Sequence, residues 1–181
     1  DLAHPDLRLR PEQVRKIVEL RSRLQYFAGQ IEEAEKARVR ILTPDDEDYP
    51  APLRKIPSPP PLLCTFGRWL SGDNLAVAIV GTRQATDQGR QEATRIAQQL
   101  AKWGVTIISG MARGIDAAAH RGALSALGRT IAVLGEGLLN ISPYQRLEFA
   151  RRIASQGAVM SETAPLAPPT TARLIMRNRI I

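Results

Sequence analysis

Four loops that combine glycine with charged side chains carry the chemistry that this sequence offers. They cover residues 81–86, 110–116, 135–140 and 162–179, and each follows an apolar run. Glycine lets a backbone approach a ligand closely, and a helix N-terminus offers free amides to an anion. Arginine adds a planar fork that grips phosphate oxygens in pairs. With Arg83, Arg113, Arg177 and Arg179, the loops predict a phosphate-binding surface.

Several of these residues have a structural interpretation beside a functional one. Gly81 and Gly110 can simply end strands. We expect Asp116 to cap the helix that follows it rather than to act as a catalytic acid. His120 lies four residues further along the same helix face, where a structural hydrogen bond is favoured over catalysis.

Three other side chains are weighed in the same way. We expect Glu162 to cap a helix or to pair with an arginine, and Phe149 to pack in a helix. Tyr144 falls on a predicted loop, where stacking on a base and a plain structural role are equally open.

The sequence lacks the common signatures of an enzyme. It has one cysteine, Cys64, and two distant histidines, His4 and His120, so neither a disulfide nor a zinc site is predicted. A Walker A motif and a G-x-S-x-G elbow are missing, and Gly135-Glu136-Gly137 lacks the third glycine of a dinucleotide fingerprint. No pair of acidic residues stands out as an acid–base site. We expect no catalytic activity, no cofactor and no metal.

Alternating apolar runs and amphipathic segments predict the scaffold of the loops. Strands are predicted at 75–80, 105–109, 130–134 and 158–161, and helices at 88–103, 117–127 and 146–156. Runs without in/out alternation are typical of strands buried on both faces, and crossover helices make such strands parallel. The pattern predicts an open, doubly wound α/β sheet. Ligands of such sheets bind outside the carboxyl ends of the strands, where all four loops would lie.

Two segments precede this sheet. Residues 1–40 are polar and helical in pattern, with one helix starting near Arg10-Pro11 and a second over 30–38, which predicts a small helical domain. Residues 41–74 contain a proline-rich stretch at 57–61 and a predicted edge strand at 62–67. We interpret 41–74 as a connector packed against the larger domain, residues 75–181.

Charge and composition limit the classes of partner that the protein is expected to bind. The 181 residues are 44% hydrophobic and carry a net charge of +7, with 25 basic and 18 acidic residues. Residues 1–74 are neutral, whereas 75–181 hold 13 basic and 6 acidic residues, and 12 of those 13 are arginines. The excess points to a polyanion, although a genome that favours arginine codons explains the arginines equally well. No signal peptide or membrane-spanning run is visible, so we expect a cytoplasmic protein.

The motifs together resemble the bacterial DNA processing protein A family (DprA, also called Smf). The resemblance rests on Val80-Gly81-Thr82-Arg83, on the run from Ser109 to His120, on Thr130–Gly135, on Ser161-Glu162 and on Arg177-Asn178-Arg179-Ile180-Ile181. The segment 43–50 and the prolines 59–61 also look like the family. The resemblance covers about residues 38–181.

The resemblance implies a fold and a function. The fold is an extended Rossmann-like, mostly parallel sheet preceded by a SAM-like helical piece. The function is sequence-independent binding of single-stranded DNA, which protects incoming DNA and loads the RecA recombinase during natural transformation, with the protein acting as a homodimer away from membranes. The implied DNA contacts are Gly81, Thr82, Arg83, Ser109, Gly110, Met111, Ala112, Arg113, Gly114, Gly135, Gly137, Tyr144, Arg177, Asn178 and Arg179.

The sequence departs from the family pattern at two places. Leu139 and Ser142-Pro143 stand where the family has Asp and Tyr-Pro, and Leu174-Ile175-Met176 stand where it favours Phe-Pro. Two other functions are weighed against DNA binding. A phosphoribohydrolase-type enzyme would hold a nucleoside monophosphate at the same edge, but its Pro-Gly-Gly-x-Gly-Thr loop is missing. An interaction scaffold would leave the arginines as a solvated face.

Overall fold

The computed structural model describes residues 10–21 and 23–181, so His4 and the rest of 1–9 lie outside the described residues. Its centre is a six-stranded sheet in the order β1-β2-β6-β5-β4-β3. The strands are β1 (Arg40–Leu42), β2 (Leu63–Gly67), β3 (Ala76–Ala78), β4 (Thr106–Ser109), β5 (Thr130–Leu134) and β6 (Ala158–Ser161). Strands β3 to β6 pair in parallel, and β1 and β2 add to them in antiparallel. The predicted α/β class and mostly parallel sheet are confirmed.

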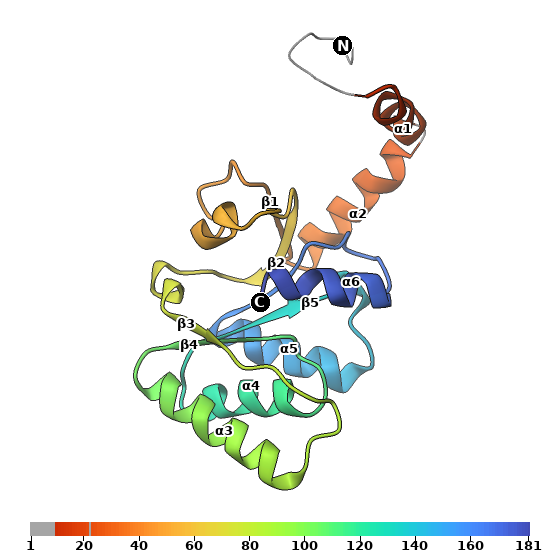
Figure 1. Ribbon diagram of the computed structural model, residues 1–181. Coiled ribbons are helices and arrows are strands. Elements are labelled where there is room, and N and C mark those ends of the chain that lie inside the picture. Colours follow the sequence, from red (N-terminus) through yellow and green to blue (C-terminus); the bar gives the residue numbers. More distant parts are fainter. Residues whose placement is uncertain (1–9, 22) are drawn as a thin grey trace.

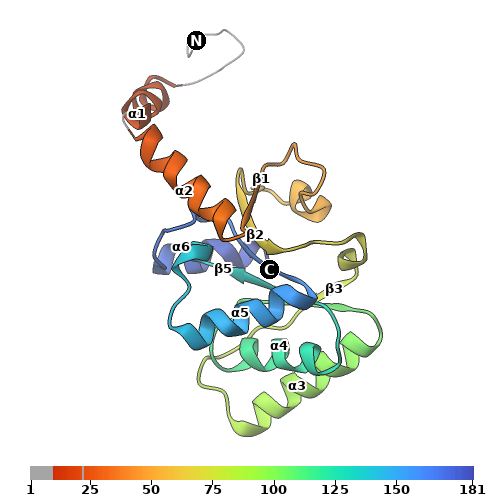
Figure 2. The same ribbon diagram turned by 180° about the vertical axis from the view of Figure 1, so that it is seen from behind.

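Three crossover helices cover one face of the parallel strands. They are α3 (Asp87–Lys102), α4 (Ile115–Ser125) and α5 (Tyr144–Gln156), and they lie together below the strands in Figures 1 and 2. Consecutive strands are neighbours from β3 to β6, so every crossover of the same hand places its helix on the same side. The strand order does not reverse among the described strands, and in this respect the winding differs from that of a doubly wound sheet.

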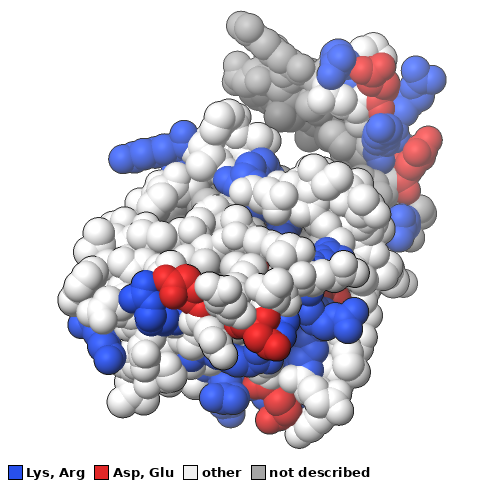
Figure 3. Space-filling view, turned by 60° about the horizontal axis from the view of Figure 1, so that its bottom comes forward, with Lys and Arg blue, Asp and Glu red and all other residues white. Residues whose placement is uncertain are grey.

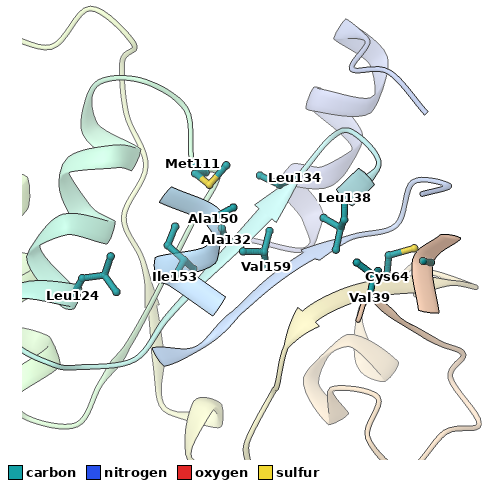
Figure 4. Close-up of a cluster of buried hydrophobic side chains, with 11 residues drawn as sticks. Val39, Cys64, Met111, Leu124, Ala132, Leu134, Leu138, Ala150, Ile153 and Val159 are labelled. Carbon is teal, nitrogen blue, oxygen red and sulfur yellow. The ribbon is translucent and has the colours of Figure 1, made fainter. Parts of the chain in front are cut away.

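Register assigns the strand residues to two cores. Ala132 lies opposite Val159, and both face α5, where Ala150 and Ile153 complete a buried cluster (Figure 4). The neighbouring pair Val133 and Met160 points to the other face. Leu53 and Ile180 cover that face, so the connector and the end of the chain provide what crossover helices do not.

Two predicted strands occupy positions in the sheet that differ from those expected. The strand over 62–67 is not an edge strand, because β2 lies between β1 and β6. The connector 41–74 therefore contributes to the sheet itself. The strand after Leu75 was predicted to be buried on both faces, but β3 is the outer strand of the described sheet, and Val77 is exposed. An outer strand has one neighbour, and its apolar side chains are covered on fewer sides.

The N-terminal helices extend away from the sheet. They are α1 (Pro11–Arg21) and α2 (Leu24–Lys36), and both project from the top of the molecule in Figure 1. The second helix begins earlier than predicted. Only Gln30 and Ala34 of α2 are buried, and no residue of α1 is. Within the described residues, no helix has the length and apolar character needed to cross a bilayer.

The amino ends of the parallel strands are held by an ion pair whose carboxylate is buried. Asp73 lies in the short 3-10 helix η2 (Ser71–Asn74) and is fully buried. Its carboxylate accepts hydrogen bonds from Arg129 Nε at 2.6 Å, from the Thr106 hydroxyl at 2.7 Å and from the Leu70 amide at 2.8 Å. Burial opposes ionisation of Asp73, but these donors together hold the pKa of its carboxyl below the usual value. The Arg129 side chain thus has a structural role.

Candidate functional site

A groove of about 640 Å³ opens at the carboxyl ends of β3 and β4. Three segments that are distant in sequence form it: the loop after β3, the loop that leads into α4, and the C-terminal segment with α6 (Thr171–Met176) and the 3-10 helix η4 (Arg177–Arg179). Five predicted site residues line it, namely Gly81, Arg83, Ala112, Arg177 and Asn178. The sheet therefore brings together parts of three of the four predicted loops: 81–86, 110–116 and the end of 162–179 that carries Arg177 and Asn178.

Asp116 ties the two loops of the groove to each other. Its carboxylate accepts hydrogen bonds from the amides of Gly110 at 3.2 Å, Ala112 at 3.4 Å and Gly81 at 3.4 Å. The expected helix cap is therefore not its role, because Gly114 is the N-cap of α4 and Asp116 lies in the first turn. A carboxylate already occupies the position in which these amides would hold an anion. The expectation of free backbone amides is wrong at these three positions.

Glycine is required where the loops touch. Gly114 has a φ of +86°, and a side chain there would collide with the carbonyl of Thr82. Gly110 faces the guanidinium of Arg177, which fills the space that a Cβ would take. Both glycines thus serve close packing of the loops rather than contact of backbone with a ligand.

Arg177 lies under the floor of the groove. Its side chain is buried, and Nη1 donates to the carbonyls of Gly110 and Val133, each at 2.5 Å. Its Nε has no hydrogen-bond partner. Burial lowers the pKa of Arg177, and the cations of Arg83 and Arg146 act in the same direction, while Asp116 opposes them. Among the described residues no carboxylate lies within ion-pair distance of Arg177, so it adds positive potential to the groove.

The other predicted arginines differ in whether their side chains are free to contact a ligand. Arg83 is exposed and lines the groove, and Arg113 is exposed on the loop before α4. Arg179 is held by Glu162, with Nη1 at 3.1 Å from Oε1 and a second contact between Nη2 and Oε2. The expectation that Glu162 pairs with an arginine is confirmed. Arg179 is thereby turned away from the groove and lines a separate apolar cavity on the sheet.

Several predicted contacts are inside the protein. Ser109 is fully buried and its hydroxyl donates to the carbonyl of Ile79 at 2.6 Å. Met111 is a core residue with a φ of +56°. Gly137 packs against the turn at Ala164 and Pro165, and Gly135 packs against α6. These residues can shape the site only through the backbone that they support.

Tyr144 and the loop before it are not part of the groove. Tyr144 begins α5 rather than lying on a loop, and it is exposed. Its neighbour Arg146 forms an ion pair with the buried carboxylate of Glu136. Sequence reasoning missed Arg146, whose charge reaches Arg177. The spacing of Glu136 and Arg146 gives no motif, because a loop brings them together.

His120 is structural, as expected. Thr130 Oγ1 donates to the carbonyl of Ile107 at 2.8 Å and lies 2.7 Å from His120 Nδ1. Since that hydroxyl proton is used, Nδ1 carries the ring hydrogen and donates to Thr130. Burial first, and the charge of Arg177 second, lower the pKa of His120 to about 3. The ring is neutral at physiological pH. In the part of the chain that the structure describes, no cluster of side chains is suited to a metal ion.

The helix face carries basic and acidic side chains together (Figure 3). In Figure 3, basic side chains lie beside acidic ones over the surface drawn. Along α3 and α5 the pairs repeat at a spacing of three residues, as in Arg95–Glu92 at 2.5 Å and Arg151–Glu148 at 2.7 Å. Their positive charge is therefore largely compensated locally, in contrast to that of Arg83 and Arg177.

Comparison with known proteins places the chain among DNA-processing proteins. Residues 40–181 match the family model for DNA recombination-mediator protein A. The chain is 44% identical to protein Smf of Synechocystis over 172 residues, 93% of this chain and 43% of that protein. It is 35% identical to the DNA processing protein DprA of Bacillus subtilis over 75% of this chain and 46% of that protein. The chain thus spans less than half the length of these relatives.

Two solved structures of DNA processing protein A also match this chain in fold. DNA processing protein A of Streptococcus pneumoniae matches with a TM-score of 0.68 and 34% identity over 78% of this chain and 50% of that one. The protein from Helicobacter pylori, described for a single-stranded DNA binding mode, matches with a TM-score of 0.67 and 30% identity over 78% of this chain and 64% of that one.

Proposed function

Because this chain belongs to the DNA recombination-mediator protein A family, we propose that it binds single-stranded DNA without sequence preference, at the groove beyond β3 and β4. The relative from Helicobacter pylori is described as a single-stranded DNA binder. In this chain the proposal assigns the phosphate contact to Arg83, with Asn178 lining the same groove. Arg113 is a further candidate from the adjoining loop.

The observation that carries the proposal is the charge of the groove. Arg83 is exposed at its wall, and Arg177 lies beneath it without a carboxylate partner among the described residues. Two cations that have no ion-pair partner among the described residues attract a polyanion and release its counterions on binding. Phosphate contacts carry no sequence information, which is why binding would not depend on sequence.

The proposal also explains why the groove would not serve catalysis. Asp116, the acidic residue that lines the groove, accepts hydrogen bonds from three loop amides, and His120 is buried and neutral. Neither is free to exchange a proton with a bound ligand. A nucleotide-processing enzyme would need such a group in contact with its substrate. We therefore propose a non-enzymatic binder and not a phosphoribohydrolase.

The role of the whole protein in the cell is inferred from its family. We propose that the whole protein protects incoming single strands and loads RecA during natural transformation, as a cytoplasmic homodimer. The described groove supplies the DNA contact of that role.

Fluorescence anisotropy with a single-stranded and a double-stranded oligomer across a salt series tests the proposal. We expect tighter binding of the single strand and a linear fall of log K with log salt. Arg83→Ala should weaken binding and make the slope shallower by about 0.7, the contribution of one phosphate contact on a single strand.

Arg68→Ala is the matched control. Arg68 is also an exposed arginine, but it follows β2 and lies at the amino ends of the parallel strands, away from the groove. It should leave affinity and slope unchanged. Equal behaviour of the two variants would remove Arg83 from the site, and release of a free base from AMP by the protein would refute the non-enzymatic assignment.

A further inference from the structure

The edge of the sheet opposite the groove carries a group of exposed apolar side chains. It lies where the parallel strands begin and is formed by residues 68–75 before β3, by the turn 101–105 between α3 and β4, and by the turn 126–129 between α4 and β5. The large apolar side chains exposed in these segments are Leu70 at 47%, Leu75 at 62%, Trp103 at 68% and Leu127 at 84%. We call these three segments the amino-edge surface. Grouped apolar side chains are more typical of an interaction surface than single ones.

Contacts between the segments join them into one edge. The carbonyl of Leu75 accepts a hydrogen bond from the amide of Thr106 at 3.0 Å, which ties the first segment to the start of β4. A Cβ added at Gly128 would lie 2.6 Å from the Cβ of Ala101, so the two helix-to-strand turns touch each other. The residues beside these contacts include Trp103 in one turn and the residue before Gly128 in the other.

Leu127 has a backbone conformation that its side chain does not favour. Its φ is +55°, in the left-handed region, and it follows the end of α4, where the amide of Gly128 donates to the carbonyl of Ala123 at 3.0 Å. Glycine or asparagine usually takes such a position, because an L side chain costs free energy there. The Leu127 side chain is 84% exposed, so burial within the described chain offsets little of that cost. A contact with a partner would offset it.

The charge of the amino-edge surface is positive. Lys102 and Arg68 are exposed, and neither forms an ion pair within the described residues. The single acidic residue of the three segments is Asp73, which is fully buried and paired with Arg129. Exposed cations beside exposed apolar side chains, with no exposed carboxylate among them, are complementary to a partner that is both acidic and apolar.

We propose that the amino-edge surface is a docking site for an acidic amphipathic segment of a partner protein, in which carboxylates flank large apolar side chains. Trp103 and Leu127 contact the apolar side chains of that segment, and Lys102 and Arg68 face its carboxylates. Tryptophan is among the residue types that contribute most to affinity at protein interfaces. The carboxyl and amino ends of the strands are opposite edges of the sheet, so the partner and a ligand of the groove can be bound together. The inference does not depend on the proposed function.

Charge and composition favour this occupant over three others. A nucleic acid would meet two cations but would leave the aliphatic side chains of the surface uncovered. An anionic membrane is recognised by clusters of several basic residues, whereas this surface has two that are free of ion pairs among the described residues. A second copy of the chain, docked through the same surface, would bring cations against cations with no exposed carboxylate between them.

Fluorescence anisotropy with a short labelled peptide tests the proposal. The probe carries glutamates on one helical face and leucine and phenylalanine on the other. One reference peptide has lysine in place of glutamate, and a second has serine in place of the apolar residues. The acidic amphipathic peptide should bind more tightly than either reference and should shift the emission of Trp103 to shorter wavelength. Trp103→Ser should abolish that shift and weaken binding about tenfold, and Lys102→Ala should weaken it about threefold.

Two further variants separate docking from a structural role. Ile175→Ser is the matched control, because Ile175 is 64% exposed but lies at the groove edge, and peptide binding should be unchanged. Leu127→Gly should weaken peptide binding, while the midpoint of thermal unfolding stays the same or rises, since glycine accepts the φ of this position. A lower midpoint with unchanged peptide binding would show that Leu127 serves the fold alone and would count against the proposal.

The remaining outcomes refute the proposal directly. It fails if the acidic amphipathic peptide does not bind the wild-type chain, or if Trp103→Ser binds it as well as Ile175→Ser does. Binding of oligo-dT or of phosphatidylserine vesicles that depends on Trp103, in place of peptide binding, would assign the surface to another class of ligand. A dimer that Trp103→Ser dissociates, or a Trp103 shielded from acrylamide quenching in the whole protein without peptide, would show that the surface is already covered.

Discussion

Lowering the pH from 7 to 5 is expected to weaken the fold through His120. The ring is fully buried, and its Nε2 has no hydrogen-bond partner. Burial and the nearby charge of Arg177 lower its pKa from 6.5 to about 3. On unfolding the ring enters water and its pKa returns to the ordinary value near 6.5. The unfolded chain therefore binds a proton between pH 6.5 and 3 that the folded chain does not.

The size of the effect follows from this difference. Because the folded-state pKa is depressed, the contribution of His120 to stability is present above pH 6.5 and is lost as the pH falls. Integrating proton uptake by the unfolded state from pH 7 to pH 5 gives a loss of about 2 kcal/mol in the free energy of unfolding. The value is the same for any folded-state pKa below about 4, since the folded ring stays neutral throughout this interval.

Urea denaturation followed by circular dichroism at pH 7, 6 and 5 measures the loss. His120→Asn should have lower stability at pH 7, because a packed ring is removed, but its stability should change little between pH 7 and pH 5. His4→Asn removes the other histidine and should keep the wild-type pH dependence. A loss in His120→Asn as large as that in the wild type would refute the burial argument.

Three further predictions concern side chains that are buried within the fold. Asp116→Ala should lower the free energy of unfolding by about 3 kcal/mol, because three loop amides lose their acceptor at roughly 1 kcal/mol each; a urea melt no different from that of the exposed-site variant Glu92→Ala would contradict this. Asp73→Ala should cost about 3 kcal/mol, because the Arg129 guanidinium, the Thr106 hydroxyl and the Leu70 amide lose their acceptor at roughly 1 kcal/mol each, and the midpoint of thermal unfolding checks it. Burial raises the pKa of the Cys64 thiol to about 11, so a thiol reagent at pH 8 should label it only as the protein unfolds in urea; rapid labelling of the native chain would show that the core opens.

The local sequence pattern was enough to predict most of the strands and helices of the scaffold. The four apolar runs beginning at residues 75, 105, 130 and 158 all contain strands, and the helices between them begin and end within a few residues of their predicted bounds. These elements are set by hydrophobic periodicity and by glycine at their ends, which are properties of neighbouring residues. The strand Arg40–Leu42 was missed because three residues carry too short a pattern. The edge position assigned to β2 was wrong because strand order depends on pairings that no single segment encodes.

The site was predicted in outline and corrected in detail. Sequence reasoning brought the loops after Val80 and Ser109 to one edge of the sheet together with the Arg-Asn-Arg segment, and the structure joins them at one groove. It treated the arginines as equivalent, whereas Arg177 is buried under the groove and Arg179 is paired with Glu162. That aliphatic side chains such as Val80 and Ile175 also line this groove was not predicted.

By itself the sequence determined which residue types the chain offers and the order in which strands, helices and loops follow one another. Only the tertiary structure decided which charges remain available. The reason is that neutralisation depends on distance in space: the Asp116 carboxylate reaches the amide of Gly81 across 35 residues, and the Arg177 guanidinium reaches the carbonyl of Gly110 across 67. Hydrogen bonds and contact ion pairs form only within a few ångströms, and the fold alone sets which groups come within that range.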